Sequence, residues 1–220
     1  MRNRCGAQTK ILWAAILLVP LLPLAQGVFE PARLDTWEPP MSSPNVVAWG
    51  QEWLSVSVDA AGVVTQMTPL REALAFSDDL RGAIREWSFV PARADGEPVS
   101  SVVLVTAVFV PAELGTLPDL NRPPMPAASQ SPVPIASPLP AYPPRAKGSG
   151  IVLVEVTVDE NGAVGLPTLV SSATGFDTAA LDTARRWQFY PATRRQRRVS
   201  SVVYLLFSFL EPVVEPPVRR

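Results

Sequence analysis

The run Ile151-Val152-Leu153-Val154-Glu155-Val156-Thr157-Val158-Asp159-Glu160-Asn161-Gly162 decides the fold of this chain. Its first eight residues alternate with a period of two, which predicts a strand whose core face carries every second residue from Val152 to Val158. The Asn-Gly pair is a strong signal for a tight hairpin turn, because both residues tolerate positive φ. A second strand is therefore expected to return over residues 163–171, and Pro167 favours an edge or a bulge there.

A helix and a last strand complete this unit. Asp177 is expected to cap the helix, because its carboxylate can accept free amide hydrogens of the first turn. Ala180, Leu181, Ala184 and Trp187 then fall on one face, and Pro191 marks the end of the helix. A strand over 199–209 follows, with alternate residues from Val199 to Phe209 on one side. The predicted fold class is α+β, with an antiparallel three-stranded sheet packed against a helix in the order β-β-α-β.

Residues 46–109 repeat in residues 146–209 without a gap, one hundred positions later. The matches include Val58-Asp59-x-x-Gly62 with Val158-Asp159-x-x-Gly162. Trp87-x-Phe89-x-Pro91-Ala92 recurs as Trp187-x-Phe189-x-Pro191-Ala192, and Val99-Ser100-Ser101-Val102-Val103 as Val199-Ser200-Ser201-Val202-Val203. The sequence therefore predicts two tandem modules. In the first copy, Leu54, Val56 and Val58 should face the core and a helix should run near Ser77–Phe89.

The expected domain organisation follows from composition. Residues 1–27 combine basic residues, an apolar run and Ala25-Gln26-Gly27, which is typical of an export signal cut near Gly27. An uncleaved anchor is the alternative, and contact with a membrane is expected only if residues 11–25 stay in place. The modules should occupy 28–112 and 141–212. The Pro-rich segment 113–140 is read as a linker unable to bury a core, and 213–220 as a tail.

Several classes of function are disfavoured by composition. The chain has no histidine, one cysteine (Cys5) and a formal net charge of −1. No nucleophile–base set and no metal-ligand spacing can be found, so we expect no catalytic residue, no metal and no cofactor. The net charge gives no reason to expect nucleic acid as a partner. Asp59 and Asp159 lie in turns, where Asp bonds locally, and Trp87 and Trp187 are expected in the core.

The second copy resembles the TonB carboxy-terminal domain family over most of residues 142–209. The resemblance rests on Tyr142-Pro143, the Val158-Asp159-x-x-Gly162 hairpin, Ser172 ahead of Gly175, Asp177-x-x-Ala180, and Trp187-x-Phe189-x-Pro191-Ala192. The first copy shares the hairpin and the Trp-x-Phe-x-Pro-Ala segment.

The resemblance implies a periplasmic, non-enzymatic module that binds envelope proteins and serves outer-membrane receptors or TonB-type transport. Family members pair a receptor segment with their last strand, which is β-strand addition. On this chain that strand is Val199–Phe207, and the residues implied are Val199, Ser201, Val203, Leu205 and Phe207. Tyr142 and Pro143 are either part of a partner site or an ordinary domain entrance. A homodimer is a further alternative.

A second hypothesis concerns the same strands. In this alternative the two modules pair with each other through their last strands, which would make the chain a structural or adaptor protein of the envelope without energy transduction. Arg194, Arg195, Arg197 and Arg198 form a cluster beside the last strand. Residues 28–112 hold 5 basic and 11 acidic side chains, whereas residues 141–212 hold 8 and 6. The cluster is therefore either an anion-facing patch for an acidic partner segment or envelope polymer, or a solvated loop.

Overall fold

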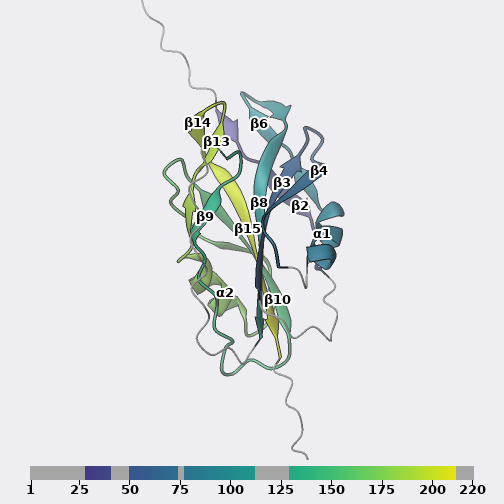
Figure 1. The fold of residues 1–220 in the computed structure, drawn as a ribbon, viewed down its shortest axis with the longest axis vertical. Helices are drawn as coiled ribbons and strands as arrows, with labels where there is room; N and C mark the ends of the chain where they lie inside the picture. The colour runs from purple at the N-terminus through teal and green to yellow at the C-terminus, as the bar shows by residue number, and fades with distance from the viewer. Residues whose placement is uncertain (1–27, 41–49, 74–76, 112–128, 212–220) are drawn as a thin grey trace, which may run out of the picture.

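The computed structural model describes residues 28–40, 50–73, 77–111 and 129–211 (Figure 1). The export signal or anchor expected over 1–27 and the tail over 213–220 lie outside the described residues. So do residues 113–128 of the expected linker. We refer to residues 28–111 as the N-terminal half and to residues 129–211 as the C-terminal half.

A six-stranded sheet carries the fold, and the chain is α+β, as predicted. The strand order is β11 (Thr168–Ser171), β10 (Gly150–Val158), β15 (Ser201–Leu210), β8 (Ser101–Pro111), β3 (Gly50–Val58), β4 (Val64–Arg71). Neighbours within each half are antiparallel, whereas β15 and β8 run parallel. The two halves therefore share one continuous sheet, instead of each closing a three-stranded sheet of its own.

The two helices cover opposite faces of this sheet. Leu80 and Ile84 of α1 (Ser77–Arg85) belong to one buried cluster, and Ala180 and Ala184 of α2 (Asp177–Ala184) belong to the other. In Figure 1 the strands pass between α1 on one side and α2 on the other. Each face of the sheet is thus covered by the helix of a different half.

The helix boundaries differ from the predicted ones in two ways. The first helix ends at Arg85 and not near Phe89, because Ser88–Val90 forms the short strand β5. Asp177 is not the N-cap of α2: Phe176 holds that position without a side-chain cap. The Asp177 carboxylate instead accepts hydrogen bonds from Ser172 Oγ (2.5 Å) and from the amide nitrogen of Ala173 (2.8 Å). It fixes the loop that enters the helix.

The two central strands are buried on both faces. In β15, Val203, Leu205, Phe207 and Phe209 pack in the cluster with α2, while Val202, Tyr204 and Leu206 pack in the cluster with α1. In β8, Val103, Val105, Ala107 and Phe109 face α1, while Leu104 and Val108 face α2. Nearly continuous apolar runs are typical of strands covered on both sides. The predicted core faces of β3 and β10 are also buried.

The parallel pairing of β15 with β8 is shifted by one residue from the repeat. Val203 pairs with Leu104 and Leu205 with Thr106, an offset of 99 where the repeat spacing is 100. The helices cover opposite faces, so equivalent residues of the two halves point to opposite faces. Paired residues of a sheet must point to the same face, and a slip of one residue reverses the face. The offset of 99 satisfies this condition.

Short outer strands complete each half. β1 (Phe29–Glu30), β6 (Ala92–Ala94) and β7 (Glu97–Val99) form one small sheet, and β2 (Arg33–Thr36) pairs with β5. In the C-terminal half, β9 (Val133–Ala136) pairs with β12 (Gln188–Tyr190), and β13 (Ala192–Arg194) pairs with β14 (Arg197–Val199).

The expected linker is wrong over residues 129–140. Val133 is 7% exposed, and β9 lies one hundred positions after β2 and pairs with the equivalent strand. Trp187 Nε1 donates to the carbonyl of Pro138 (3.1 Å), as Trp87 Nε1 donates to the carbonyl of Glu38 (2.9 Å). Four prolines in this stretch do not prevent strand formation, because β9 is an outer strand where a missing N–H is tolerated.

Candidate partner-binding surface

The strand nominated for partner binding is not an edge. β15 pairs with β10 from Ser201 to Phe209 and with β8 from Val203 to Leu210. Val199 belongs to a different strand, β14, and pairs with Ala192. The prediction that Val199, Ser201, Val203, Leu205 and Phe207 lie along a free edge is therefore wrong, because the last strand of the N-terminal half occupies that flank. This arrangement is the one that the second hypothesis expected.

The outer strands of the sheet are β4 and β11. Both carry features that discourage the addition of another strand. β4 contains Pro69, which lacks an N–H donor, and β11 has four residues directly after Pro167. Pro167 thus stands beside an edge strand, as the sequence suggested. Strand addition is poorly supported at either edge.

Tyr142 and Pro143 take part in the packing of the C-terminal half. The Tyr142 hydroxyl donates to the carbonyl of Gly148 (2.7 Å), and its ring meets Phe176 edge-on at a centroid distance of 5.5 Å. The carbonyl of Pro143 accepts from the amide nitrogen of Ala146 (3.0 Å). These contacts are those expected of an ordinary domain entrance, and a partner site at Tyr142 and Pro143 stays a prediction.

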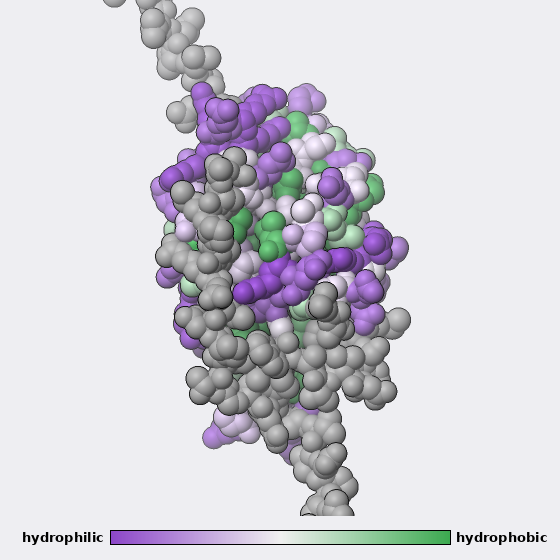
Figure 2. Space-filling model, viewed as in Figure 1, coloured by the Kyte–Doolittle hydropathy of each residue, from purple (hydrophilic) through white to green (hydrophobic). Residues whose placement is uncertain are grey.

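The arginine cluster forms the β13–β14 hairpin, which we call the arginine hairpin (Arg194–Arg198). Arg195, Arg197 and Arg198 are exposed, and Arg194 is half-buried with its guanidinium carbon 4.8 Å from the centre of the Phe29 ring. Among the described residues, none of the four arginines has an ion-pair partner. Figure 2 shows hydrophilic side chains gathered over the end of the molecule where Figure 1 places β13 and β14.

The turn of the arginine hairpin has an unusual backbone. Arg195 and Gln196 have φ values of 48° and 64°, a region that side chains with a Cβ disfavour. The matching turn of the N-terminal half has φ values of 55° and 87°, but there the residues are Asp95 and Gly96, which suit that conformation. The C-terminal half therefore carries cationic and polar side chains at two positions where the backbone favours Asn, Asp or Gly. Strain of this kind is often found at functional sites.

A small cavity lies beside this hairpin, where β8 and β15 begin. Its volume is about 240 Å³, and its wall is drawn from both halves. Ser101 and Ser201 are part of that wall, together with Arg194 and Arg195. Ser201 is 3% exposed.

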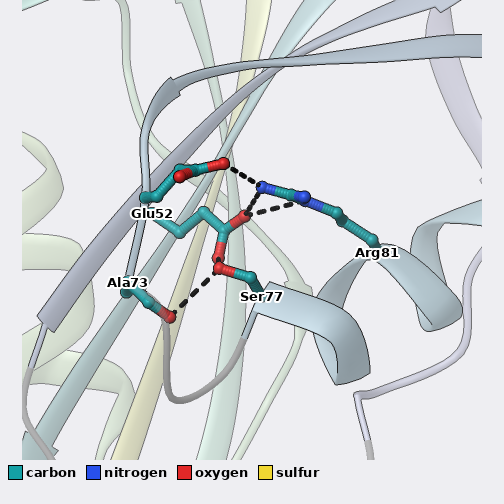
Figure 3. Close-up of polar contacts among 5 residues, drawn as sticks. Glu52, Ala73, Ser77 and Arg81 are labelled. Atoms are coloured by element: carbon teal, nitrogen blue, oxygen red, sulfur yellow. Dashed lines mark hydrogen bonds and ion pairs between the residues drawn. The ribbon is translucent and has the colours of Figure 1, made fainter.

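A buried carboxylate occupies the N-terminal half (Figure 3). Glu52 is fully buried and accepts hydrogen bonds from Ser77 Oγ (2.7 Å) and Arg81 Nε (3.3 Å), both on α1. Burial raises the pKa of Glu52, and the hydrogen bond from Ser77 and the charge of Arg81 oppose that rise. The C-terminal half has Val152 in the same position. This carboxylate fixes α1 to β3, and all of its contacts are internal.

A polar clamp joins the two halves. Tyr204 is fully buried; its hydroxyl donates to Glu155 Oε2 (3.0 Å) and accepts from the amide nitrogen of Leu34 (2.6 Å). Arg33 forms an ion pair with the same glutamate. Burial raises the pKa of Tyr204. Because Arg33 and Leu34 belong to β2, this clamp holds β2 of the N-terminal half against β10 and β15 of the C-terminal half.

The carboxylates of the hairpin turns serve the backbone. Asp59 Oδ1 accepts from the amide nitrogens of Ala61 and Val63 (both 2.9 Å), and Asp159 Oδ1 accepts from those of Asn161 and Ala163 (both 2.8 Å). These hydrogen bonds lower the pKa of Asp159. Both residues have the local role predicted for them. Trp87 and Trp187, each 2% exposed, are in the core as predicted.

The described residues contain no group of three or more His, Cys, Asp or Glu side chains that could hold a metal ion. Within the same residues, no helix is long and apolar enough to cross a membrane. The described residues thus form an open six-stranded sheet with one helix on each face and a cationic hairpin at one end.

A family model matches most of the C-terminal half. Residues 138–209, which are 72 of the 220, match the family model described as Gram-negative bacterial TonB protein C-terminal. The matched segment is thus similar to a family of periplasmic, non-enzymatic domains that take part in envelope protein interactions. Curated proteins gave no match.

Sequence reasoning missed two features of this surface, the cavity and the clamp, and it gave the pairing of the last strands only as the second hypothesis. The pairing had a readable signal. In Val202-Val203-Tyr204-Leu205-Leu206-Phe207, both alternating faces are apolar, which is typical of a central strand and not of an edge. The clamp had none, because Arg33, Glu155 and Tyr204 are far apart in the sequence.

Proposed function

We propose that this protein is a non-catalytic adaptor of the cell envelope, built from two copies of one TonB-like module whose last strands pair with each other. The observation that carries the proposal is the ladder of eight residue pairs between β15 and β8. In this ladder β8 occupies the side of β15 along which a partner strand would be added. The match of residues 138–209 to the TonB family supports a role in binding envelope proteins.

The continuous sheet also supports a role in which β15 stays in place when a partner binds. Each buried cluster contains side chains of both halves: Tyr204 and Leu206 pack with α1, and Trp53 and Leu104 pack with α2. Freeing β15 for a partner would expose two apolar faces and break this ladder. Exposing a single large apolar side chain costs about 1.5–3 kcal/mol, so freeing a strand of this kind costs far more than one contact returns. Binding is therefore assigned to a surface that is already free.

That surface is the arginine hairpin. Its exposed guanidinium groups stand at the end of a half that holds more basic than acidic side chains. Guanidinium groups bind carboxylates in a bidentate manner, so an acidic segment of an envelope protein fits this surface. The strained turn at Arg195 and Gln196 adds support, because selection for stability alone would favour Asp-Gly here, as in the N-terminal half.

The adaptor proposal is tested by locking the two last strands together. Ala107 and Leu206 are direct partners in the β8–β15 ladder. Neighbouring strands lie about 4.8 Å apart, within the range that a disulfide can span. We expect an Ala107→Cys/Leu206→Cys variant, in a Cys5→Ser background, to capture the same envelope proteins when oxidised and when reduced. The reduced form is the matched control. Capture that is lost on oxidation and restored on reduction would show that β15 must leave β8, which contradicts the adaptor.

The binding surface is tested separately. Changing the four arginines of the hairpin to serine should abolish capture, and capture by the unchanged chain should weaken as salt rises, because exposed charges are screened. Arg185 and Arg186, at the end of α2, are exposed in the same half and provide a control pair for serine substitution. Capture that is insensitive both to salt and to the four substitutions would remove the hairpin from consideration.

A further inference from the structure

The cavity beside the arginine hairpin lies where the parallel ladder has not yet begun. β8 starts at Ser101 and β15 at Ser201, but the first pair between them is Leu104 with Val203. The cavity between these strand ends is lined by residues 100–102 of the N-terminal half and 199–201 of the C-terminal half, and the β13–β14 hairpin contributes to the wall. The volume of about 240 Å³ is below the range of drug-sized pockets, roughly 300–1,000 Å³, so a small group fits it.

Two buried hydroxyls in this wall lack a hydrogen-bond partner in the described part of the chain. They are Ser101 Oγ and Ser201 Oγ. Ser201 itself is 97% covered, since its exposed fraction is 3%. Buried polar groups of folded proteins are nearly always hydrogen-bonded, so two orphaned hydroxyls in the wall of one cavity call for an explanation. A ligand that accepts hydrogen bonds would satisfy both.

The charged residues of the wall indicate the charge of that ligand. Arg194 and Arg195 are the charged residues of the wall. The guanidinium carbon of Arg194 lies 4.8 Å from the centre of the Phe29 ring, which places this cation at the cavity wall, and a guanidinium carries five N–H donors. The wall therefore offers cationic N–H donors and hydroxyls, which are suited to an anion.

The rest of the wall narrows the chemical class. Ala32, Val102, Ala192 and Val199 line the cavity beside the donors. We propose that the cavity binds a carboxylate group that carries a small apolar substituent. Arg194 and Arg195 supply the charge, Ser101 and Ser201 donate hydrogen bonds, and the apolar side chains receive the substituent. A phosphate would turn oxygens toward these apolar side chains, which is unfavourable. This site goes beyond the proposed function and does not depend on it.

A carboxylate of this kind has two sources: a free short-chain acid, or the carboxyl terminus of a polypeptide. The experiment is a titration of the full chain, followed by amide NMR. The probes are butyrate, N-acetyl-Gly-Val, the same dipeptide with an amidated carboxyl terminus, and inorganic phosphate. We expect the acids to shift the Ser101 and Ser201 resonances and the amide to leave them unchanged. A dipeptide acid that binds at least tenfold more tightly than butyrate assigns the site to a chain terminus; equal affinities assign it to free acids. An amide or phosphate that binds as well as the acids overturns the proposal.

Substitutions locate the site. Ser201→Ala and Arg194→Gln should each weaken carboxylate binding on the order of tenfold, the effect of losing one hydrogen bond to a charged group. Arg197→Gln changes the same hairpin outside the cavity wall and should leave binding unchanged. Ser201→Ala removes an unbonded hydroxyl, so its Tm should not fall, which excludes misfolding as the cause. Binding that survives both wall substitutions would disprove the site. Envelope-protein capture should survive Ser201→Ala, so failure of this site and failure of the adaptor proposal can be told apart.

Discussion

Thr106 carries a buried hydroxyl in the middle of β8. It is fully buried, and its Oγ1 has no hydrogen-bond partner in the described part of the chain. Its neighbours across the sheet are Trp53 and Leu205. A buried hydroxyl that is left unbonded costs roughly 1–3 kcal/mol. We expect Thr106→Val, which keeps the shape of the side chain, to raise the free energy of unfolding by about 1 kcal/mol in urea denaturation.

The matched control for Thr106→Val is Thr183→Val. Thr183 is also buried, but its Oγ1 accepts a hydrogen bond from Arg186 (3.2 Å), so that substitution should lower the stability or leave it unchanged. A loss of stability in Thr106→Val would mean that the Thr106 hydroxyl is bonded in solution.

Because Glu52 is buried, we expect the free energy of unfolding to depend on pH. Burial raises its pKa in the folded protein above the ordinary value of 4.5. The protonated form therefore favours the folded state. This contribution is complete below the unfolded value, and it is lost as pH rises through the folded value. We expect the unfolding free energy of the unchanged chain to fall relative to that of Glu52→Gln as pH rises from about 4 to 8, measured by urea denaturation.

Glu72→Gln is the control for this effect. Glu72 contacts the same guanidinium of Arg81, but its side chain is 46% exposed. Glu72→Gln keeps Glu52 and its hydrogen bonds to Ser77 and Arg81, so the unfolding free energy of this variant should still fall as pH rises. A difference between the unchanged chain and Glu52→Gln that stays constant over the same range would show that burial does not hold a proton on Glu52.

At the scale of elements, the backbone angles predict that the β13–β14 turn is less stable than its counterpart in the N-terminal half. A residue with a Cβ in the left-handed region costs about 1–2 kcal/mol. We expect Gln196→Gly, which keeps all four arginines, to raise the free energy of unfolding by about 1 kcal/mol. Capture of partners should not change. Thermal and urea denaturation measure the first effect.

The reverse change in the N-terminal half is the control. Gly96 has a φ of 87°, and a Cβ placed on it would meet nothing within 4 Å. Gly96→Ala should therefore lower the stability by about 1 kcal/mol through backbone strain alone. If neither substitution alters the stability, the backbone at these turns relaxes in solution and the strain argument fails.

Elements with local signals were predictable from the sequence, and elements that depend on distant residues were not. Val152, Val154, Val156 and Val158 alternate, and all are buried as expected. β9 was missed, because proline-rich composition hid an outer strand that pairs with β12. The central position of β15 was only the second hypothesis, because the residues of one face were considered and the apolar Val202, Tyr204 and Leu206 on the other face were not.

At the scale of the molecule, the two halves should behave as one folding unit. A protease site placed within residues 112–128 allows the chain to be cut between them. We expect the cut halves to stay together in size-exclusion chromatography, because each buried cluster contains side chains of both. They should also unfold in a single transition.

The variant Tyr204→Phe also tests whether the two halves form one folding unit. It removes the hydroxyl that joins Leu34 to Glu155, which should cost about 2 kcal/mol and weaken the association of the cut halves. Tyr142→Phe removes a hydroxyl bonded within one half and should leave the association unchanged. Halves that separate on cutting, or that unfold in two transitions, would show that the shared sheet adds little stability.

The offset of 99 in the β8–β15 ladder has a consequence for self-association. A rotation by 180° about an axis along the strands would place equivalent residues side by side with their side chains on opposite faces, which a ladder does not allow. The β8–β15 ladder therefore needs a rotation combined with a shift of one residue along the strand. Such a screw operation is not part of the symmetry of a closed dimer. Two identical copies of either half therefore cannot form this ladder in a two-fold symmetric dimer. In a single chain the two strands can differ, as Leu104 and Tyr204 do at positions one hundred residues apart.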